Sequence, residues 1–368
     1  MSRGRARRVG HRGLVVLLAA CTALGALLTF APLASAASGR AKARGAAGHK
    51  TLVHKKKAKP RSLFPVTFAL PGASVDWGFL YLANRAGYFR DNGIKVTFDT
   101  VSVPAIVPGL VSGTFQATPL TGTVLRAALG GAPVVDVMTV ENRDDAGLGV
   151  APGISSVAQL AGKTIVTSPV GSSPYVTLKQ LLVKAGVFGK VNILSLGTET
   201  AQETAFISGQ AQAIFLSFDN VVTAVSKVRG AKILVTPLQA GPTGGYSGLA
   251  VSRSFLVQHG TVVLGLIKSI LEGVKLVLTQ PARTEKLIQS LFGYTKAQAK
   301  LLYNDIIHVY QLNPVPTKAE LANDAALTSL STGKSLSEAD IASFWSTTMA
   351  ARAYKELGCP KLCAPRRS

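Results

Sequence analysis

From Phe64 onward, the pattern of hydrophobic and polar positions alternates between two periods. Short runs of continuous or alternating apolar residues are followed by stretches with apolar residues three and four positions apart, as far as about Ser252. The first pattern is typical of strands and the second of amphipathic helices. Strands that alternate with helices are expected to be parallel and joined by crossover helices, so the pattern predicts an α/β fold.

The predicted elements form two series and a helical end. The first series has strands over 65–70, 94–101, 116–120 and 134–140, with helices over 75–89, 104–113 and 123–129. The second has helices over 155–161, 174–185, 199–208 and 220–228, with strands over 163–167, 191–196, 211–217 and 231–235. A strand over 248–252 returns toward the first series. Residues 255–357 are predicted to be helical, with breaks near Pro281, Pro314 to Pro316 and Gly333.

The two series contain a similar short segment. Residues 112–117 read SGTFQA and residues 208–213 read SGQAQA, and both stand where a predicted helix runs into a predicted strand. Each glycine suits the left-handed position after a helix. The similarity supports two lobes of like construction.

Charge is distributed very unevenly along the 368 residues. The formal net charge is +22, but residues 1–62 hold 14 Lys and Arg and no acidic residue. With Lys361, Arg366 and Arg367 also set aside, residues 63–360 hold 23 basic and 18 acidic residues. The basic surplus therefore lies in flanking segments without interleaved aromatic residues, and we predict no nucleic-acid partner.

The N-terminus has the three parts of a secretory signal. Five arginines precede an apolar run over 14–30, and a small-residue triplet ends at Ala36. We predict a signal peptide over 1–36 and an exported protein. Cys21 could instead be lipidated, because the residues before it resemble a lipoprotein box, or the run could stay as an anchor of about the length that a span needs. All these interpretations export the chain.

Residues 37–62 are rich in Gly, Ala and Lys, and we predict a disordered basic linker there. A solvated linker is the simpler interpretation; adhesion to an anionic membrane or cell-wall polymer is the alternative. At the other end, a basic tail over 359–368 holds Cys359 and Cys363. In an oxidising compartment they could form a small disulfide, or both could be free thiols.

The folded part offers little for catalysis. It contains two isolated histidines, His259 and His308, and no nucleophile elbow, zinc-protease helix or phosphate-binding loop motif. Glu199 with Glu203, and Asp144 with Asp145, are most simply solvated polar residues. We predict no catalytic residue, no metal and no cofactor.

Binding features are better represented, because four segments stand where strands give way to helices, the place where α/β proteins bind ligands. These segments are 72–79, 121–123, 170–175 and 217–220. Gly171, Ser172 and Ser173 precede a helix and could hold an anion, although a plain helix cap explains them equally well. Trp77, Tyr175, Phe218 and Tyr246 could give flat contacts, although such residues are as often part of a core.

Three segments resemble a known family. Residues 83–96 (ANRAGYFRDNGIKV), 128–134 (ALGGAPV) and 160–165 (LAGKTI) resemble, in order and spacing, the substrate-binding proteins of ABC importers for nitrate, sulfonates, taurine and thiamin precursors. The family commonly has Gly-x-x-Asp before two strands. Here Gln116 and Gln212 stand in the place of the acid.

The resemblance implies an α/β fold of the type II periplasmic-binding kind, with two lobes, two hinge crossings near 147–153 and 237–248, and a helical C-terminal portion. The first lobe would comprise 63–150 and 239–358, and the second lobe 151–238. Carried onto this chain, it implies ligand contacts in the cleft. The expected binding residues are Ser74, Asp76, Trp77, Thr121, Thr123, Gly171, Ser172, Ser173, Tyr175, Phe218, Asp219, Asn220 and Tyr246.

The resemblance also implies a function: a monomer that captures a small organic molecule and delivers it to an ABC permease and its ATPase. A sulfonate or taurine-like ligand and a heteroaromatic one, such as a pyrimidine, both stay open. No arginine is securely placed in the four segments, and Asp76 beside Trp77 suits a neutral or cationic ring. A surface sensor or adhesion module, and an enzyme similar to pyrimidine-precursor synthases, are the alternatives.

Overall fold

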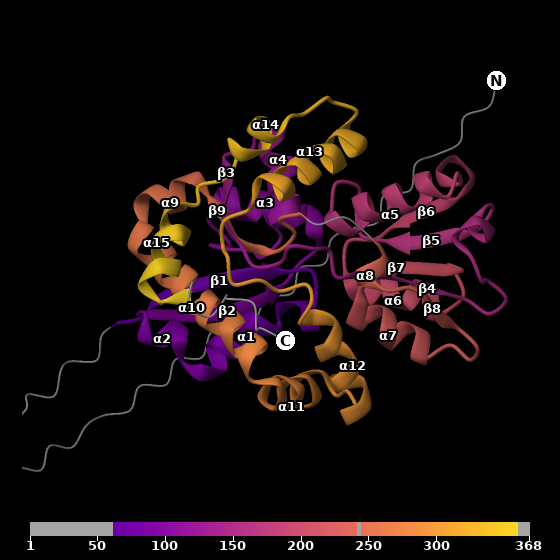
Figure 1. Cartoon of the computed structure of the whole chain (residues 1–368), viewed down its shortest axis with the longest axis horizontal. Helices are drawn as coiled ribbons and strands as arrows, with labels where there is room; N and C mark the ends of the chain where they lie inside the picture. Colours follow the sequence, from indigo (N-terminus) through magenta and orange to yellow (C-terminus); the bar gives the residue numbers. More distant parts are fainter. Residues whose placement is uncertain (1–61, 241–243, 360–368) are drawn as a thin grey trace, which may run out of the picture. The chain divides into compact units, whose positions relative to one another are not determined.

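The structure is a computed structural model that describes residues 62–240 and 244–359 (Figure 1). The predicted signal peptide, Cys21, residues 37–61 of the basic linker and Cys363 lie outside the described residues. Within the described ranges, no helix combines the length and the apolar character needed to cross a membrane. Cys359 is buried, and its predicted disulfide with Cys363 stays a prediction.

The first lobe is built on two strand pairs. β1 (Phe64–Leu70) runs parallel to β2 (Ile94–Thr100), and β3 (Val134–Thr139) runs antiparallel to β9 (Gly248–Ser252). Single bridges from Ala117 to Phe68 and from Thr118 to Ala250 connect the pairs. The 3-10 helix η1 (Val75–Trp77) and helices α1 (Gly78–Ala86), α2 (Tyr88–Asp91), α3 (Val103–Ser112) and α4 (Thr121–Leu129) belong to this lobe.

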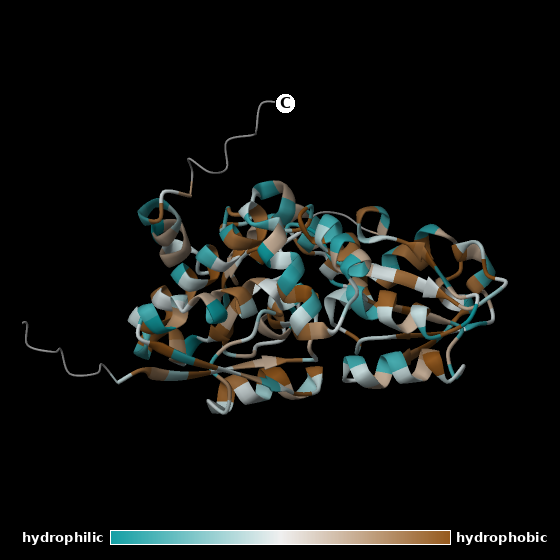
Figure 2. Cartoon of the chain, turned by 90° about the horizontal axis from the view of Figure 1, so that it is seen from below, coloured by the Kyte–Doolittle hydropathy of each residue, from teal (hydrophilic) through white to brown (hydrophobic). Residues whose placement is uncertain are grey.

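The second lobe is one five-stranded sheet with the order β6-β5-β7-β4-β8. Its strands are β4 (Ala146–Val150), β5 (Thr164–Thr167), β6 (Asn192–Ser195), β7 (Ala213–Ser217) and β8 (Lys232–Val235). Its helices are η2 (Val157–Leu160), α5 (Ser173–Lys184), η3 (Phe188–Lys190), α6 (Glu199–Ile207), α7 (Phe218–Ser226) and α8 (Pro237–Ala240). In Figure 2 the apolar residues gather on the strands and on the helix faces turned to them.

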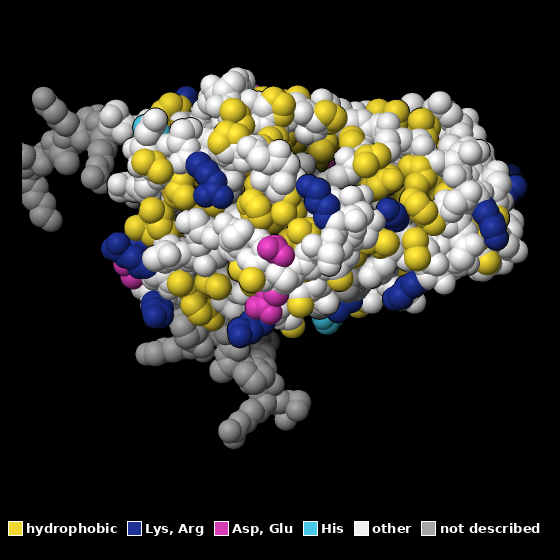
Figure 3. Space-filling model, turned by 90° about the horizontal axis from the view of Figure 1, so that it is seen from above, with side chains coloured by type: hydrophobic (Ala, Val, Ile, Leu, Met, Phe, Trp, Pro, Cys, Tyr) yellow, Lys and Arg dark blue, Asp and Glu magenta, His cyan; other side chains and the backbone are white. Residues whose placement is uncertain are grey.

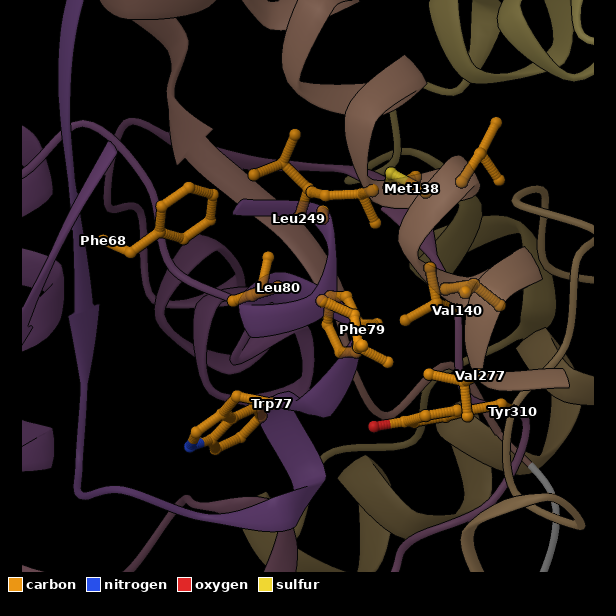
Figure 4. Close-up of a cluster of buried hydrophobic side chains, with 14 of the residues drawn as sticks. Phe68, Trp77, Phe79, Leu80, Met138, Val140, Leu249, Val277 and Tyr310 are labelled. Atoms are coloured by element: carbon orange, nitrogen blue, oxygen red, sulfur yellow. The ribbon is translucent and has the colours of Figure 1, made fainter. Parts of the chain in front are cut away.

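The C-terminal portion is helical, as predicted. It comprises α9 (Arg253–Gln258), α10 (Gly260–Thr279), α11 (Pro281–Phe292), α12 (Lys296–Ile306), α13 (Lys318–Thr332), α14 (Glu338–Ala342) and α15 (Thr348–Glu356). The breaks at Pro281 and Gly333 are confirmed, with Gly333 in the left-handed conformation that ends α13. Helix α10 packs along α1, and both contribute to the largest hydrophobic core (Figure 4).

Two predicted features of the sheets are wrong. The strand expected over 116–120 is reduced to single bridges, because Pro119 has no N–H to donate to a neighbouring strand. Conversely, residues 146–150 were expected to belong to the first lobe and the first hinge, but β4 lies between β7 and β8 and is antiparallel to both. The first crossing is thus made by residues 140–145, before the predicted 147–153.

The repeated segment has the same structure in both lobes. Gln116 Oε1 accepts a 2.8 Å hydrogen bond from the Thr67 backbone N–H, and Gln116 Nε2 donates one of 2.8 Å to the Gly113 carbonyl. Gln212 does the same with Thr164 N, at 3.1 Å, and Gly209 O, at 3.3 Å. Each glutamine therefore connects a helix end to a strand of its own lobe, β1 for Gln116 and β5 for Gln212, which is a structural role.

Candidate functional site

A cavity lies where the two lobes meet at the crossings. Its interior volume open to a water-sized molecule is about 40 Å³, and all the non-atom space out to the solvent at the mouth is about 500 Å³. The first lobe contributes the segment after β1 and the start of α4. The second contributes the loop after β5, the start of α6 and the end of β7. The crossings themselves form part of the wall, through Glu141, Asp144 and Asp145 in the first and Tyr246 and Ser247 in the second.

Six of the thirteen predicted binding residues line this cavity. They are Asp76, Trp77, Thr123, Ser172, Ser173 and Tyr246. They come from four segments far apart in the sequence, as expected for loops at the ends of strands and at the crossings. Trp77 is 2% exposed, and in Figure 4 its ring nitrogen points away from the other labelled side chains of the core.

Four other predicted residues hold the walls in place. Ser74 Oγ donates a 2.8 Å hydrogen bond to Asp219 Oδ1, and the backbone N–H of Val75 donates one of 2.7 Å to Asp219 Oδ2. Thr121 Oγ1 donates to the Gly245 carbonyl at 2.9 Å. The Gly171 carbonyl accepts a hydrogen bond from Arg126 Nε. The structure places none of these four in the lining of the cavity.

The remaining three predicted residues also lie outside the lining. Phe218 belongs to the large hydrophobic core, and Tyr175 packs beside the small cluster of Val176, Tyr246 and Leu327. Asn220 is buried in the first turn of α7. None of the expected contacts at 218–220 lines the cavity, whereas Ser217, which was not among them, does.

The most informative wall residues were not predicted. Glu141, Asp144, Asp145 and Glu199 line the cavity, and each is at most 5% exposed. The interpretation of Asp144, Asp145 and Glu199 as solvated residues is wrong. Other unpredicted lining residues are Pro71, Val103, Leu120, Ser168, Pro174, Leu216 and Ser247. In the sequence, these wall residues were indicated only by the position of acidic residues next to a predicted hinge crossing.

Several polar atoms of this lining have no hydrogen-bond partner among the described residues. They include the acceptors Asp76 Oδ1, Glu141 Oε1 and Glu199 Oε2, and the hydrogen-bearing groups Trp77 Nε1 and Tyr246 OH. Buried polar groups are almost always paired in native proteins. Unpaired atoms gathered around one cavity therefore indicate that something polar occupies it in the functional protein.

Burial changes the titration of these carboxyl groups. It raises the pKa of Asp76, and the negative charge of Glu141 raises it further. The pKa of Glu199 is raised to about 8 by burial, with the negative charge of Asp219 adding to the effect. Burial likewise raises the pKa of Asp144 to about 6. Each carboxyl is thus held in surroundings that resist its ionisation unless a positive group is added.

Arg126, whose charge acts on Asp144, already donates hydrogen bonds to other groups. Burial lowers the pKa of Arg126 to about 10, and its Nη2 donates a 3.1 Å hydrogen bond to Ser173 Oγ. Ser172 Oγ accepts from the Tyr175 backbone N–H, so it caps α5 in the ordinary way. The segment 171–173, predicted to hold an anion, is therefore explained by the cap of α5 and by its hydrogen bonds from Arg126.

Possible metal ligands and surface charge complete the description. In the described ranges, no group of three or more His, Cys, Asp and Glu side chains is placed to hold a metal ion. On the face shown in Figure 3, Lys and Arg side chains are scattered and form no continuous stripe. A basic stripe is what a nucleic-acid interface would need.

The sequence and the fold match known proteins. Residues 74–284 match the family model described as NMT1/THI5 like. The alkanesulfonate-binding protein SsuA of Xanthomonas axonopodis pv. citri, bound to MOPS, superposes with a TM-score of 0.60 at 20% identity, covering 76% of this chain and 97% of its own. No protein with curated annotation matches the sequence.

Two more solved structures have the same fold. The nitrate-binding protein NrtA of Synechocystis PCC 6803 has a TM-score of 0.62 at 11% identity and covers 83% of this chain and 91% of its own. The desulfurization enzyme DSZB has a TM-score of 0.56 at 12% identity, covering 80% and 99%. The expected periplasmic-binding-protein fold is confirmed, and both binding proteins and an enzyme share it.

Proposed function

The chain belongs to the NMT1/THI5-like family, and from this premise we propose that it is the extracytoplasmic ligand-binding component of an ABC importer. In this proposal it captures a small organic molecule between its lobes and delivers it to a membrane permease driven by an ATPase. The observation that carries the proposal is the cavity at the lobe crossings, whose walls come from both lobes.

The position of the cavity supports capture by lobe closure. Asp76 and Trp77 come from the first lobe, Ser172 and Glu199 from the second, and Tyr246 from a crossing. A ligand that touches all of them must hold the lobes together. Closure of this kind is a hinge motion about a few residues at element ends, and such motions take microseconds to milliseconds.

The ligand-binding role of six predicted residues is part of the proposal. Asp76, Trp77, Thr123, Ser172, Ser173 and Tyr246 would contact the ligand directly. Ser74 and Asp219 would set the position of the segment after β1 through their hydrogen bond. We expect a monomer, with contacts to the permease made by surfaces outside the cavity.

A thermal-shift screen of the purified full chain tests the proposal. Sulfonates, nitrate, pyrimidines, thiamin and riboflavin form the first panel, because a ligand that binds only the folded state raises the melting temperature. The expected result is a saturable shift that Trp77→Ala removes and Trp345→Phe leaves in place. A shift unaffected by Trp77→Ala would place the binding site elsewhere and contradict the proposal.

Uptake measurements separate the proposal from its alternatives. Deletion of the gene should abolish uptake of the bound compound if a permease and an ATPase are encoded beside it. A surface sensor would bind the compound without affecting its uptake. The enzyme alternative draws support from the fold shared with DSZB, and it predicts that the compound is chemically changed on incubation, which mass spectrometry detects.

A further inference from the structure

The walls of the cavity hold several carboxyl groups and no basic side chain. Five carboxyl groups line it, from Asp76, Glu141, Asp144, Asp145 and Glu199, and none of its lining residues is Lys, Arg or His. Arg126, whose charge acts on Asp144, donates hydrogen bonds to Gly171 and Ser173. An anion placed here would lose its water and find hydrogen-bond donors but no positive side chain to balance its charge, which is unfavourable.

Two of the carboxyl groups have unpaired oxygens and come from opposite lobes. Asp76 is 5% exposed and Glu199 is 4% exposed, so both are more than nine-tenths buried. Asp76 Oδ1 and Glu199 Oε2 both lack a donor in hydrogen-bond geometry. Their nearest polar neighbours are the carboxyl group of Glu141 for Asp76 and the amide of Asn220 for Glu199. An occupant that satisfies both oxygens must offer N–H or O–H donors in two directions.

The approach of Glu199 to the first lobe is close. A methyl group built on Gly72 would lie 2.2 Å from Glu199 Oε2. Only a glycine at position 72 leaves room for this carboxyl group beside the segment that follows β1. The glycine thus allows a carboxylate of the second lobe to reach the side of the cavity that holds Asp76 and Trp77.

Trp77 lines the cavity, is part of the large hydrophobic core and offers one donor, Nε1. Its side chain is 2% exposed, and its Nε1 has no hydrogen-bond partner. Cations bind favourably over the face of an indole ring, and a flat cation can stack on it. The unpaired Nε1 additionally favours an occupant that carries one hydrogen-bond acceptor.

We propose that the ligand is a small organic cation with at least two N–H donors, whose positive group lies between Asp76 and Glu199. The inference rests on the proposed function and narrows it to one class of substrate. It sets aside the sulfonate and nitrate classes that the family resemblance implies. A cation supplies the donors that the unpaired oxygens lack and neutralises the cluster at the same time.

The test compares compounds that share a skeleton and differ in charge. One such set is benzamidine, benzamide and benzenesulfonate, and another is tryptamine, indole-3-acetamide and indole-3-propionate. Putrescine and thiamin are added as further cations. Taurine and nitrate are added as further charged controls. Each is tested on the purified full chain by thermal shift, and every hit is confirmed by calorimetry. We expect saturable binding by one or more cations and none by their neutral or anionic counterparts.

Variants of two glutamates on one helix complete the design. Glu199→Gln should weaken binding of the cation at least about 30-fold, because it removes one partner of a buried charge pair. Glu203→Gln removes a carboxyl group from the same helix, outside the lining, and should leave affinity unchanged. Glu199→Gln should also raise the melting temperature of the empty protein, which shows that it folds.

The possible outcomes test the proposed function and the cationic character of the ligand separately. Binding of a sulfonate, nitrate or a neutral ring that Trp77→Ala abolishes would overturn the cation and leave the proposed function standing. Stabilisation by Ca²⁺, Mg²⁺ or Zn²⁺ alone, lost in Glu199→Gln, would overturn the organic character of the ligand. A chain that no compound in any charge class stabilises would contradict both.

Discussion

Asp219 of the second lobe accepts a 2.8 Å hydrogen bond from Ser74 Oγ of the first. The same carboxylate accepts the Val75 backbone N–H at 2.7 Å, and Ser74 Oγ in turn accepts the Asp76 N–H at 3.1 Å. Burial raises the pKa of Asp219 to about 6, while the hydrogen bonds from Val75 and Ser74 oppose that rise. This pair connects the lobes directly behind the cavity wall and fixes the turn that presents Asp76 and Trp77.

Loss of this connection should cost stability. Ser74→Ala removes one donor from a buried carboxylate and also the cap of η1, so we expect a decrease of about 1–3 kcal/mol in the free energy of unfolding. Urea unfolding followed by circular dichroism measures it. Ser226→Ala, which deletes an exposed hydroxyl bonded only to its own helix, serves as the control and should change stability by less than about 0.5 kcal/mol. Equal effects of the two substitutions would show that the pair is not stabilising.

The empty protein should lose stability as pH rises. The pKa of Glu199 is raised to about 8 and that of Asp324 to about 7, mainly by burial. Between the ordinary carboxyl values near 4 and these raised values, the unfolded chain has already released protons that the folded chain still binds. Stability therefore decreases with pH across this window and levels off above about 8.

Melting temperatures from pH 4.5 to 8.5 check this, at constant ionic strength. Glu199→Gln should flatten the part of the decline between pH 6 and 8. A bound cation should raise the melting temperature more at pH 8 than at pH 5.5, because binding ionises the carboxyl groups. A melting temperature that increases from pH 5.5 to 8 would show that these groups are ionised and paired in the empty protein.

The sequence predicted the order of elements well, because each helix and most strands carry their own periodic pattern. It missed β4 for a physical reason. The family resemblance implied a hinge at 147–153, but a methyl group at Gly149 would lie 2.7 Å from a Val225 methyl, and one at Gly147 would lie 2.8 Å from the Phe218 ring. Both glycines are required because α7 packs directly onto this buried strand, and that contact is invisible in the local pattern.

The cavity was only half predictable. Positions after strands indicated Asp76 and Trp77, since the ends of parallel strands meet at one edge of a sheet. Local sequence could not show that Glu199 and Asp144 are buried, because an acidic residue at a helix start or in a loop is usually solvated. Their burial depends on the other lobe closing over them. Similarly, Gln116 and Gln212 stood out only as departures from the family pattern, and the structure supplies their role.

Gly72 should be required for binding because of its distance from Glu199. Gly72→Ala places a methyl group 2.2 Å from Glu199 Oε2, so the carboxyl group must move. We expect affinity for the bound cation to decrease at least about 10-fold, a loss of about 1.4 kcal/mol in binding free energy. Calorimetric titration measures this change.

Gly189→Ala is the matched control, because a methyl group there meets nothing within 4 Å. It should bind normally. Combining Gly72→Ala with Glu199→Gln should weaken binding little more than Glu199→Gln alone, since both act on the same carboxyl group. Fully additive losses would show that Gly72 acts through another part of the turn.

Trp77 should report ligand binding by its fluorescence. The chain contains two tryptophans, so Trp345→Phe leaves Trp77 as the single reporter. Trp77 is buried in the empty cavity wall with an unpaired Nε1, and a cation stacked on its ring should change both intensity and emission maximum in a saturable way. The affinity from this titration should match that from calorimetry, and both signals should vanish in Glu199→Gln at the same concentrations. A calorimetric signal without any change in Trp77 emission would mean that the ligand binds away from the ring, and the assignment of Trp77 to the site would then be wrong.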